Sequence, residues 1–284
     1  MAAGITTPPV LARLKALLPH KARATAIHLG LSGLIFGVLL YLILFRWYPQ
    51  PWFAIDGGWQ GVRIMIFVDM VLGPTLTFLV FNPNKTRLAL GVDFSFIALV
   101  QISALVWGIY AVYTQRPLAI VHWDDRFYSV DRAVLKKQNL DASVLAHLGD
   151  KLPVLAFVED PDNPDEKIEL AMKAITEGIS DYEHPRLYRP IGEHLNAIFA
   201  KQITLPRLLE KMPQAQPKLQ QLASENGLGG PEELKYLRFS GRYEEATLIF
   251  TPDGKVVGSL GVELEPVDTT KPVKKAQSKG SRRG

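Results

Sequence analysis

Two carboxylates, Asp69 and Asp93, stand inside long apolar runs of the sequence. An Asp at the centre of a bilayer costs roughly 2.5–3.5 kcal/mol on insertion scales, so such a residue usually serves a contact or a function. Three uses are open: hydrogen bonds between neighbouring helices, a proton site, and ion-coupled transport. Hydrogen bonding between helices is the simplest, because two carboxylates at different depths without a basic partner make a poor proton relay.

The depths of these carboxylates predict their partners. At 1.5 Å per residue, Asp69 lies about 10 Å from the outer end of its run, and Gln101 of the next run lies near the same level. Asp93 lies about 8 Å from the inner face, near the depth of Thr77. We therefore predict two interhelical contacts, Asp69 with Gln101 and Asp93 with Thr77.

A proline interrupts the run that holds Asp69. Pro74 removes the backbone hydrogen bond to the carbonyl of Met70, the neighbour of Asp69. The sequence therefore predicts a kink in the middle of this run. Together with Asp69, the kink would form either a bistable element or a proton site, and polar contacts between helices are the simpler interpretation.

Little in the chain points to catalysis. No GxSxG elbow, Walker loop, dinucleotide fingerprint or HExxH pair occurs, and the absence of cysteine excludes thiolate chemistry. Acidic residues at 160–166 resemble a calcium loop, but Pro164 takes the fifth position and the required Gly is missing, so helix capping explains them better. We expect no enzymatic activity, no cofactor and no metal.

The elements that position Asp69 and Asp93 are three apolar stretches, 26–45, 62–81 and 88–113. About 20 helical residues cross the hydrocarbon core of roughly 30 Å. We therefore predict an α-helical membrane protein in which residues 26–113 form three transmembrane helices in the lipid bilayer.

The short flanks predict the orientation of these helices. Residues 1–25 carry a net charge of +4 and the turn after the second stretch holds Lys85 and Arg87, whereas the Trp47–Gly61 loop has no Lys or Arg. The positive-inside rule then places the N-terminal segment in the cytoplasm. With three spans, residues 114–284 then lie on the other side of the membrane, and in a Gram-negative cell the domain at 114–264 would be periplasmic.

The polar half is acidic apart from its end. Residues 118–270 carry −8, whereas the last fourteen residues carry +6. We predict that 265–284 is a disordered basic tail, solvated by default and otherwise in contact with anionic lipid. Nothing in the sequence indicates nucleic-acid binding.

Small residues form one stripe along the first stretch. Ala26, Gly30, Gly33 and Gly37 follow a helical spacing, and 33–37 is a GxxxG match that permits close approach of another helix. The stripe packs either against the chain's own spans, the simpler interpretation, or against a partner's transmembrane helix. The aromatic Trp47–Gly61 loop is interpreted as a belt at the headgroups, with partner binding as the alternative.

Residues 114–264 have the pattern of a small α+β domain. The predicted elements are strands at 117–123, 126–130 and 152–158, a helix between Asn163 and Gly178 with the apolar stripe Ile168, Ala171, Met172 and Ile175, a second helix near 191–199, and a hairpin of 246–250 with 256–264.

Several of these features occur together in a known family. The runs WYPQPWF at 47–53, VDMVLGP at 68–74, FNPNK at 81–85 and RLYRP at 186–190, with Tyr110, Tyr113, Arg116 and Pro117, make the chain resemble the TfpX/TfpZ type IV pilin accessory proteins over residues 24–265. The resemblance implies an inner-membrane protein that assists assembly or surface display of one type IV major pilin. Its implied partners are that pilin and other pilus assembly proteins.

Two other classes of function remain open. The first is a membrane-anchored sensor or partner subunit of another envelope machine. The second is an ion-coupled transporter that uses Asp69 and Asp93. Loss of surface pili with intact pilin synthesis would separate the accessory protein from the sensor.

Overall fold

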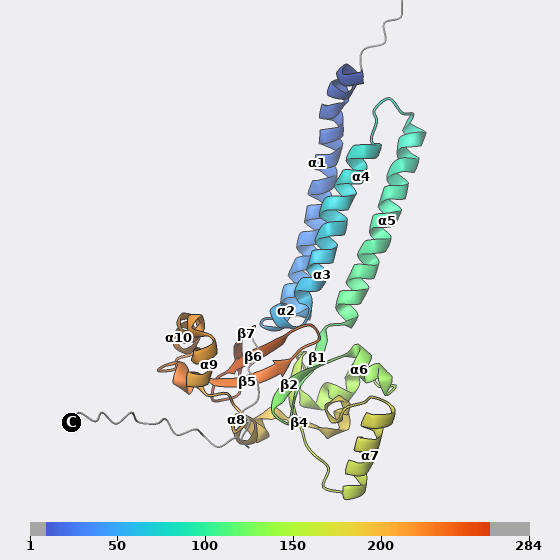
Figure 1. The fold of residues 1–284 in the computed structure, drawn as a ribbon. Coiled ribbons are helices and arrows are strands. Elements are labelled where there is room, and N and C mark those ends of the chain that lie inside the picture. Colours follow the sequence, from blue (N-terminus) through green and yellow to red (C-terminus); the bar gives the residue numbers. More distant parts are fainter. Residues whose placement is uncertain (1–9, 262–284) are drawn as a thin grey trace, which may run out of the picture.

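The computed structural model describes residues 10–261. Three long helical stretches stand on a head built around one β-sheet (Figure 1). Three apolar helices followed by an α+β region is the order that the sequence predicts. The predicted basic tail at 265–284 and the first nine residues of the N-terminal segment lie outside the described residues.

The helical part, here called the anchor, extends beyond the predicted spans. Three stretches are long and apolar enough to cross a membrane, namely Leu17–Trp47, Gly58–Val80 and Arg87–Thr114. The first helix already begins at Val10, because Pro19 does not interrupt it. The anchor elements are α1 (Val10–Leu42), η1 (Ile43–Trp47), α2 (Trp52–Ile55), α3 (Gly58–Met65), η2 (Ile66–Leu72), α4 (Gly73–Val80) and α5 (Arg87–Thr114).

The second stretch changes helix type where the sequence predicts a kink. The π-helical segment η2 ends at Leu72, and Gly73 and Pro74 begin α4. Proline is tolerated in the first turn of an α-helix, and π-helical turns often mark functional positions.

A lysine of α1 contacts the C-terminal turn of α4. Lys21 Nζ donates hydrogen bonds to the carbonyl oxygens of Phe78 and Leu79, at 2.9 and 3.2 Å. These carbonyls belong to the last turn of α4, where a cation is favoured by the helix dipole. The lysine therefore fixes α1 alongside α4, while α5 stands apart from α1 (Figure 1).

The head contains a mixed sheet with strand order β4-β3-β1-β2-β5-β6-β7. β1 pairs with β3 and β2 with β5 in parallel, and the other neighbours are antiparallel. The strands are β1 (Pro117–Trp123), β2 (Arg126–Asp131), β3 (Val154–Val158), β4 (Tyr188–Pro190), β5 (Lys235–Ser240), β6 (Glu245–Phe250) and β7 (Val256–Leu260).

Helices and short 3₁₀ turns cover the sheet. The α-helices are α6 (Arg132–Lys137), α7 (Pro164–Thr176), α8 (Leu195–Phe199), α9 (Leu205–Lys211) and α10 (Gln216–Glu225). The 3₁₀ turns are η3 (Ala142–Leu148), η4 (Asp181–Glu183), η5 (Pro185–Leu187), η6 (Ile191–His194), η7 (Pro213–Ala215) and η8 (Pro231–Glu233).

Most predicted elements of the head are present. The two hairpins, the strand near 152–158 and the helix capped by Asn163 are confirmed, and the Asn163 side chain accepts a hydrogen bond from the backbone N–H of Asp165 at 2.9 Å. The helix near 191–199 is divided into η6 and α8. Strands β4 and β5 are not among the predicted elements.

The apolar stripe of α7 does not face the core as the sequence pattern predicts. Ile168, Met172 and Ile175 are exposed by 62%, 53% and 81%, whereas Leu170 is 2% exposed. A helix that packs through Leu170 turns the longer stripe outward. The stripe is therefore an uncovered apolar surface of the described chain.

Candidate functional site

The polar residues within the anchor have other partners than the sequence predicts. Lys85 Nζ lies 2.5 Å from Asp93 Oδ2, and Thr77 Oγ1 lies 2.7 Å from His28 Nδ1. The predicted contact between Asp93 and Thr77 is therefore wrong. The turn after α4 brings Lys85 to the carboxylate, and a charge-assisted hydrogen bond is stronger than one from a hydroxyl.

Asp69 and Gln101 reach the same place without bonding to each other. Both line a cavity of about 500 Å³ between α1, the second stretch and α5, together with His28 and Thr77. No hydrogen bond joins Asp69 to Gln101 among residues 10–261. The sequence thus predicts the shared location correctly, but not a direct contact, and it misses His28 as the partner of Thr77.

Gly73 makes room for this polar cluster. A Cβ added at Gly73 would lie 1.8 Å from Gln101 Nε2 and 3.0 Å from His28 Nε2. In this arrangement the missing side chain at Gly73 leaves room for the Gln101 amide beside Pro74, and a larger residue would displace that amide. The glycine before the proline lets the Gln101 side chain lie close to the helix backbone.

The stripe of small residues faces away from this cavity. A Cβ at Gly30 or Gly37 would have nothing within 4 Å, and one at Gly33 would meet only Met70 Cε, at 3.9 Å. At 100° per residue, the stripe with Ala26 lies about half a turn around α1 from the residues that line the cavity. The simpler interpretation, packing against the chain's own spans, is therefore wrong for Gly30 and Gly37.

The loop between the first two stretches binds the head. Trp52 and Ile55 of α2 are 5% and 3% exposed and belong to the apolar core that includes Phe127, Phe239 and Leu248. The rings of Trp52 and Phe239 lie 5.7 Å apart. The interpretation of the whole loop as an aromatic belt is wrong, because its centre is buried in the chain's own head.

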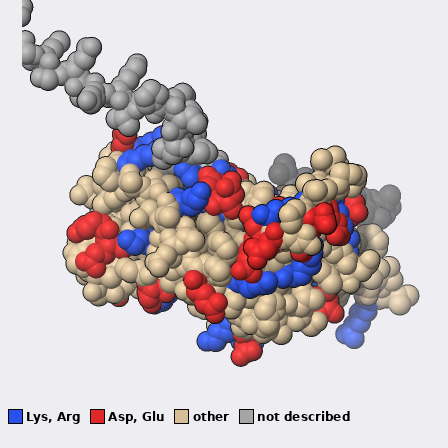
Figure 2. Space-filling model, turned by 90° about the horizontal axis from the view of Figure 1, so that it is seen from below, with Lys and Arg blue, Asp and Glu red and all other residues tan. Residues whose placement is uncertain are grey.

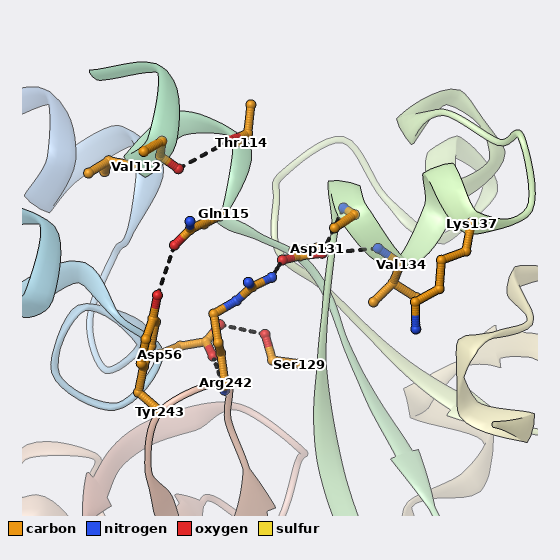
Figure 3. Close-up of polar contacts among 12 residues, drawn as sticks. Asp56, Val112, Thr114, Gln115, Ser129, Asp131, Val134, Lys137, Arg242 and Tyr243 are labelled. Atoms are coloured by element: carbon orange, nitrogen blue, oxygen red, sulfur yellow. Dashed lines mark hydrogen bonds and ion pairs between the residues drawn. The ribbon is translucent and has the colours of Figure 1, made fainter. Parts of the chain in front are cut away.

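A buried carboxylate continues this junction between anchor and head. Asp56 accepts hydrogen bonds from the Ser129 hydroxyl and, at 3.0 Å, from the backbone N–H of Arg242 (Figure 3). The Arg242 guanidinium pairs with Asp131, whose other oxygen caps α6 by accepting from the N–H groups of Ala133 and Val134. The loop, the sheet and α6 are thus tied by one polar network.

The electrostatics of Asp56 follow from its burial. Loss of solvent raises the pKa of its carboxyl from 3.8 to about 6, while the Ser129 hydroxyl and the N–H and guanidinium of Arg242 lower it. Burial is the largest of these effects, because a charge in a low-dielectric environment is destabilised.

Two tyrosines complete the junction. The Tyr243 hydroxyl donates to Gln115 Oε1 at 2.9 Å, immediately after α5 (Figure 3). The Tyr48 hydroxyl of the loop donates to the carbonyl of Val112 at 3.1 Å. The Tyr243 ring packs on Gly57, whose φ is +95°, and a Cβ there would lie 2.5 Å from the ring. Both the conformation and the contact therefore require glycine.

These contacts form a fixed connection between the anchor and the head. In residues 10–261, no three His, Asp or Glu side chains converge on a possible metal position. His122 is 2% exposed between the rings of Phe127 and Phe157, and burial lowers the pKa of its imidazole to about 4. It is therefore a neutral residue of the core.

Comparison with known proteins relates this architecture to a family. The serogroup I fimbrial assembly protein of Dichelobacter nodosus is 32% identical over 187 residues, which cover 62% of this chain and 69% of that protein. The chain belongs to the family of these fimbrial assembly proteins. The relative of serogroups C1 and C2, from the same organism, is 38% identical over 100 residues, which are 35% of this chain and 76% of that relative.

Another member of the fimbrial assembly family shows the same degree of similarity. The serogroup E1 protein of D. nodosus is 38% identical over 100 residues, 35% of this chain and 39% of the relative. No protein-family model matches the chain, and no solved structure matches it.

Proposed function

We propose that this protein is an inner-membrane accessory protein of the TfpX/TfpZ type, which assists the assembly or surface display of a type IV major pilin. The observation that carries the proposal is its membership of the fimbrial assembly family. The N-terminus of the chain would lie in the cytoplasm and the head in the periplasm. The globular head of the pilin is in the same compartment before assembly. The pilin would be contacted both in the membrane and outside it.

The junction supports contact at both levels. A pilin subunit in the inner membrane has an apolar helix in the bilayer and a globular head outside. The burial of Trp52 and Ile55 in the head and the bonds of Asp56 fix the head of this protein to the ends of its spans. Because its head is fixed to its spans, this protein can contact the transmembrane helix and the globular head of the pilin at a fixed separation.

Deletion of the gene tests the proposal. The expected result is loss or reduction of surface pili while the amount of pilin in the cell stays unchanged. Immunoblots of whole cells and of sheared surface fractions measure the two quantities. Reduced pilin synthesis would instead indicate a sensor, and unchanged surface pili would contradict the proposal.

Within the bilayer, the stripe of Ala26, Gly30, Gly33 and Gly37 is the surface for the pilin helix. Gly37→Leu fills open space, so we expect the variant to fold and insert normally but to recover several times less pilin on co-purification, because leucine keeps the helices apart. Gly91→Leu, on α5, is the matched control, since a Cβ there also meets nothing within 4 Å. Equal recovery from the two variants would remove the stripe as the contact.

Outside the bilayer, α7 presents its uncovered apolar stripe. In Figure 1, α7 lies on the side of the head away from the spans, so it does not rest on the membrane that holds them. The face of the head seen from that side shows acidic and basic side chains interspersed (Figure 2). Such a surface favours a short-range apolar contact over attraction by charge of a single sign.

A charge on α7 tests this second contact. Ile175→Asp should reduce pilin recovery about tenfold, because an unpaired charge in an apolar interface costs at least about 1.4 kcal/mol. Thermal unfolding should change little, since Ile175 is 81% exposed. Ala174→Asp adds the same charge at an exposed position off the stripe and should leave recovery unchanged. Equal losses in both variants would assign the effect to charge alone.

A further inference from the structure

The cavity in the anchor has apolar sides and a polar floor. Apolar residues of α1 and α5 form its two sides, and the second stretch packs against both helices. Its polar floor joins Asp69 and Thr77 of the second stretch with His28 of α1 and Gln101 of α5. Lining residues of the walls include Leu31, Ile35, Ile102 and Leu105. Helices α1 and α5 therefore form the two sides of a groove within the apolar part of the chain.

The floor of the groove contains hydrogen-bonding capacity that the chain does not use. Asp69 is 7% exposed, and no hydrogen bond reaches its carboxylate among the described residues. The amide of Gln101 beside it is likewise without a hydrogen-bond partner in residues 10–261, whereas Thr77 and His28 satisfy each other at 2.7 Å. Unsatisfied polar groups are unfavourable in a hydrocarbon environment, so this floor favours an occupant with polar atoms.

The nature of the occupant follows from this combination. Lipid acyl chains match the walls but cannot donate a hydrogen bond to Asp69. A cavity of about 500 Å³ holds a few side chains and not a whole helix, so a partner helix would lie along the opening and insert side chains. We propose that the groove binds a partner's transmembrane helix that carries a hydrogen-bond donor at the depth of Asp69, where the Asp69 carboxylate and the Gln101 amide oxygen accept it.

The groove and the small-residue stripe are separate surfaces on opposite sides of α1. Binding at one does not cover the other. Because the proposed function assigns the stripe to one pilin helix, the helix in the groove would belong to a second pilin subunit, and only this identity rests on the proposed function. The chemistry of the floor is independent of that identity.

Crosslinking in defined vesicles tests the inference without pilin. The full chain would carry p-benzoylphenylalanine at Ile102, which lines the groove and is 59% exposed, or at Phe96, which is 67% exposed on the other side of α5. The probes are two synthetic leucine-rich transmembrane peptides, one with a single Asn at the depth of Asp69 and one with Leu there. We expect about fivefold more crosslinking of the Asn peptide from Ile102, and equal yields from Phe96.

Substitutions at the floor complete the test. Asp69→Leu should reduce the yield of the Asn peptide to that of the Leu peptide, whereas Asp69→Asn keeps an acceptor oxygen and should retain a preference. Thermal unfolding in detergent identifies a variant that fails to fold, and Asp69→Asn keeps the test valid in that case. Equal crosslinking of both peptides, or adducts with lipid alone, would overturn the inference.

The same crosslinker, used in cells, tests whether the helix in the groove belongs to the pilin. Capture of pilin from Ile102, reduced by Asp69→Leu, would identify the occupant. If the Asn peptide binds but pilin is captured only from the stripe, the groove belongs to a different helix and the proposed function remains. If the peptides fail and the deletion still removes surface pili, the groove inference alone is wrong.

Discussion

Trp52→Ala is expected to release the head from the anchor and to lower the free energy of unfolding by about 3–5 kcal/mol, the usual cost of truncating a buried aromatic side chain. Trp52 is 5% exposed and packs with residues of β2, β5 and β6, so its removal leaves a cavity at the centre of the junction. Ile55 and the hydrogen bonds of Asp56 also hold the loop in the head, but Trp52 contributes the largest apolar side chain of this contact, so the loss should be local and severe.

Thermal unfolding in detergent and limited proteolysis measure this effect. Cleavage should become faster after α5, in the segment that connects the third stretch to β1. Trp59→Ala is the matched control, because Trp59 lies in the same region of the chain but is 41% exposed. Similar unfolding and cleavage for the two variants would contradict the assignment of Trp52 to the junction.

The second large effect concerns pH. The pKa of Asp56 is about 6 in the folded protein against an ordinary value of 3.8, so the folded state binds a proton more tightly than the unfolded state. The stabilisation from this group is present below about pH 4 and is lost as the pH rises toward 6. A shift of about 2 pH units corresponds to about 3 kcal/mol, at roughly 1.36 kcal/mol per unit.

Asp56→Asn should remove this pH dependence. The amide oxygen can still accept from the Arg242 N–H, and the Ser129 hydroxyl can turn to accept from the amide nitrogen. Because all other titrating groups remain, the difference between wild-type and variant unfolding free energies from pH 4 to 7 isolates Asp56. The variant should gain stability relative to wild type as the pH rises, and a constant difference would show that Asp56 is not buried in solution.

The spans could be predicted from the sequence because the signal is local. A run such as 88–113 needs no knowledge of its neighbours to be recognised as a long apolar helix. The hairpin of β1 and β2 and the cap at Asn163 are local in the same sense. By contrast, β5 was not predicted, although it pairs with the nearby β6; its other neighbour in the sheet is β2, more than a hundred residues earlier.

The junction could not be predicted for a related reason. An aromatic residue next to a span has the same pattern whether it meets lipid headgroups or a protein core, and the contacts that decide for Trp52 come from β2, β5 and β6. His28 shows the same ambiguity, since its bond to Thr77 depends on how α1 lies against α4. The stripe of α7 was predicted as core because periodicity shows that a helix has an apolar face, but not whether anything covers it.

The insertion of the loop into the sheet has a mechanical consequence. The chain enters the loop from the first apolar stretch and leaves it into the second, and Trp52 and Asp56 hold the centre of the loop in the head. A tilt or rotation of these two helices would thus be transmitted to the β-strands without an intervening flexible linker. We therefore expect the position of the head to change when contact with another helix tilts or rotates these two helices.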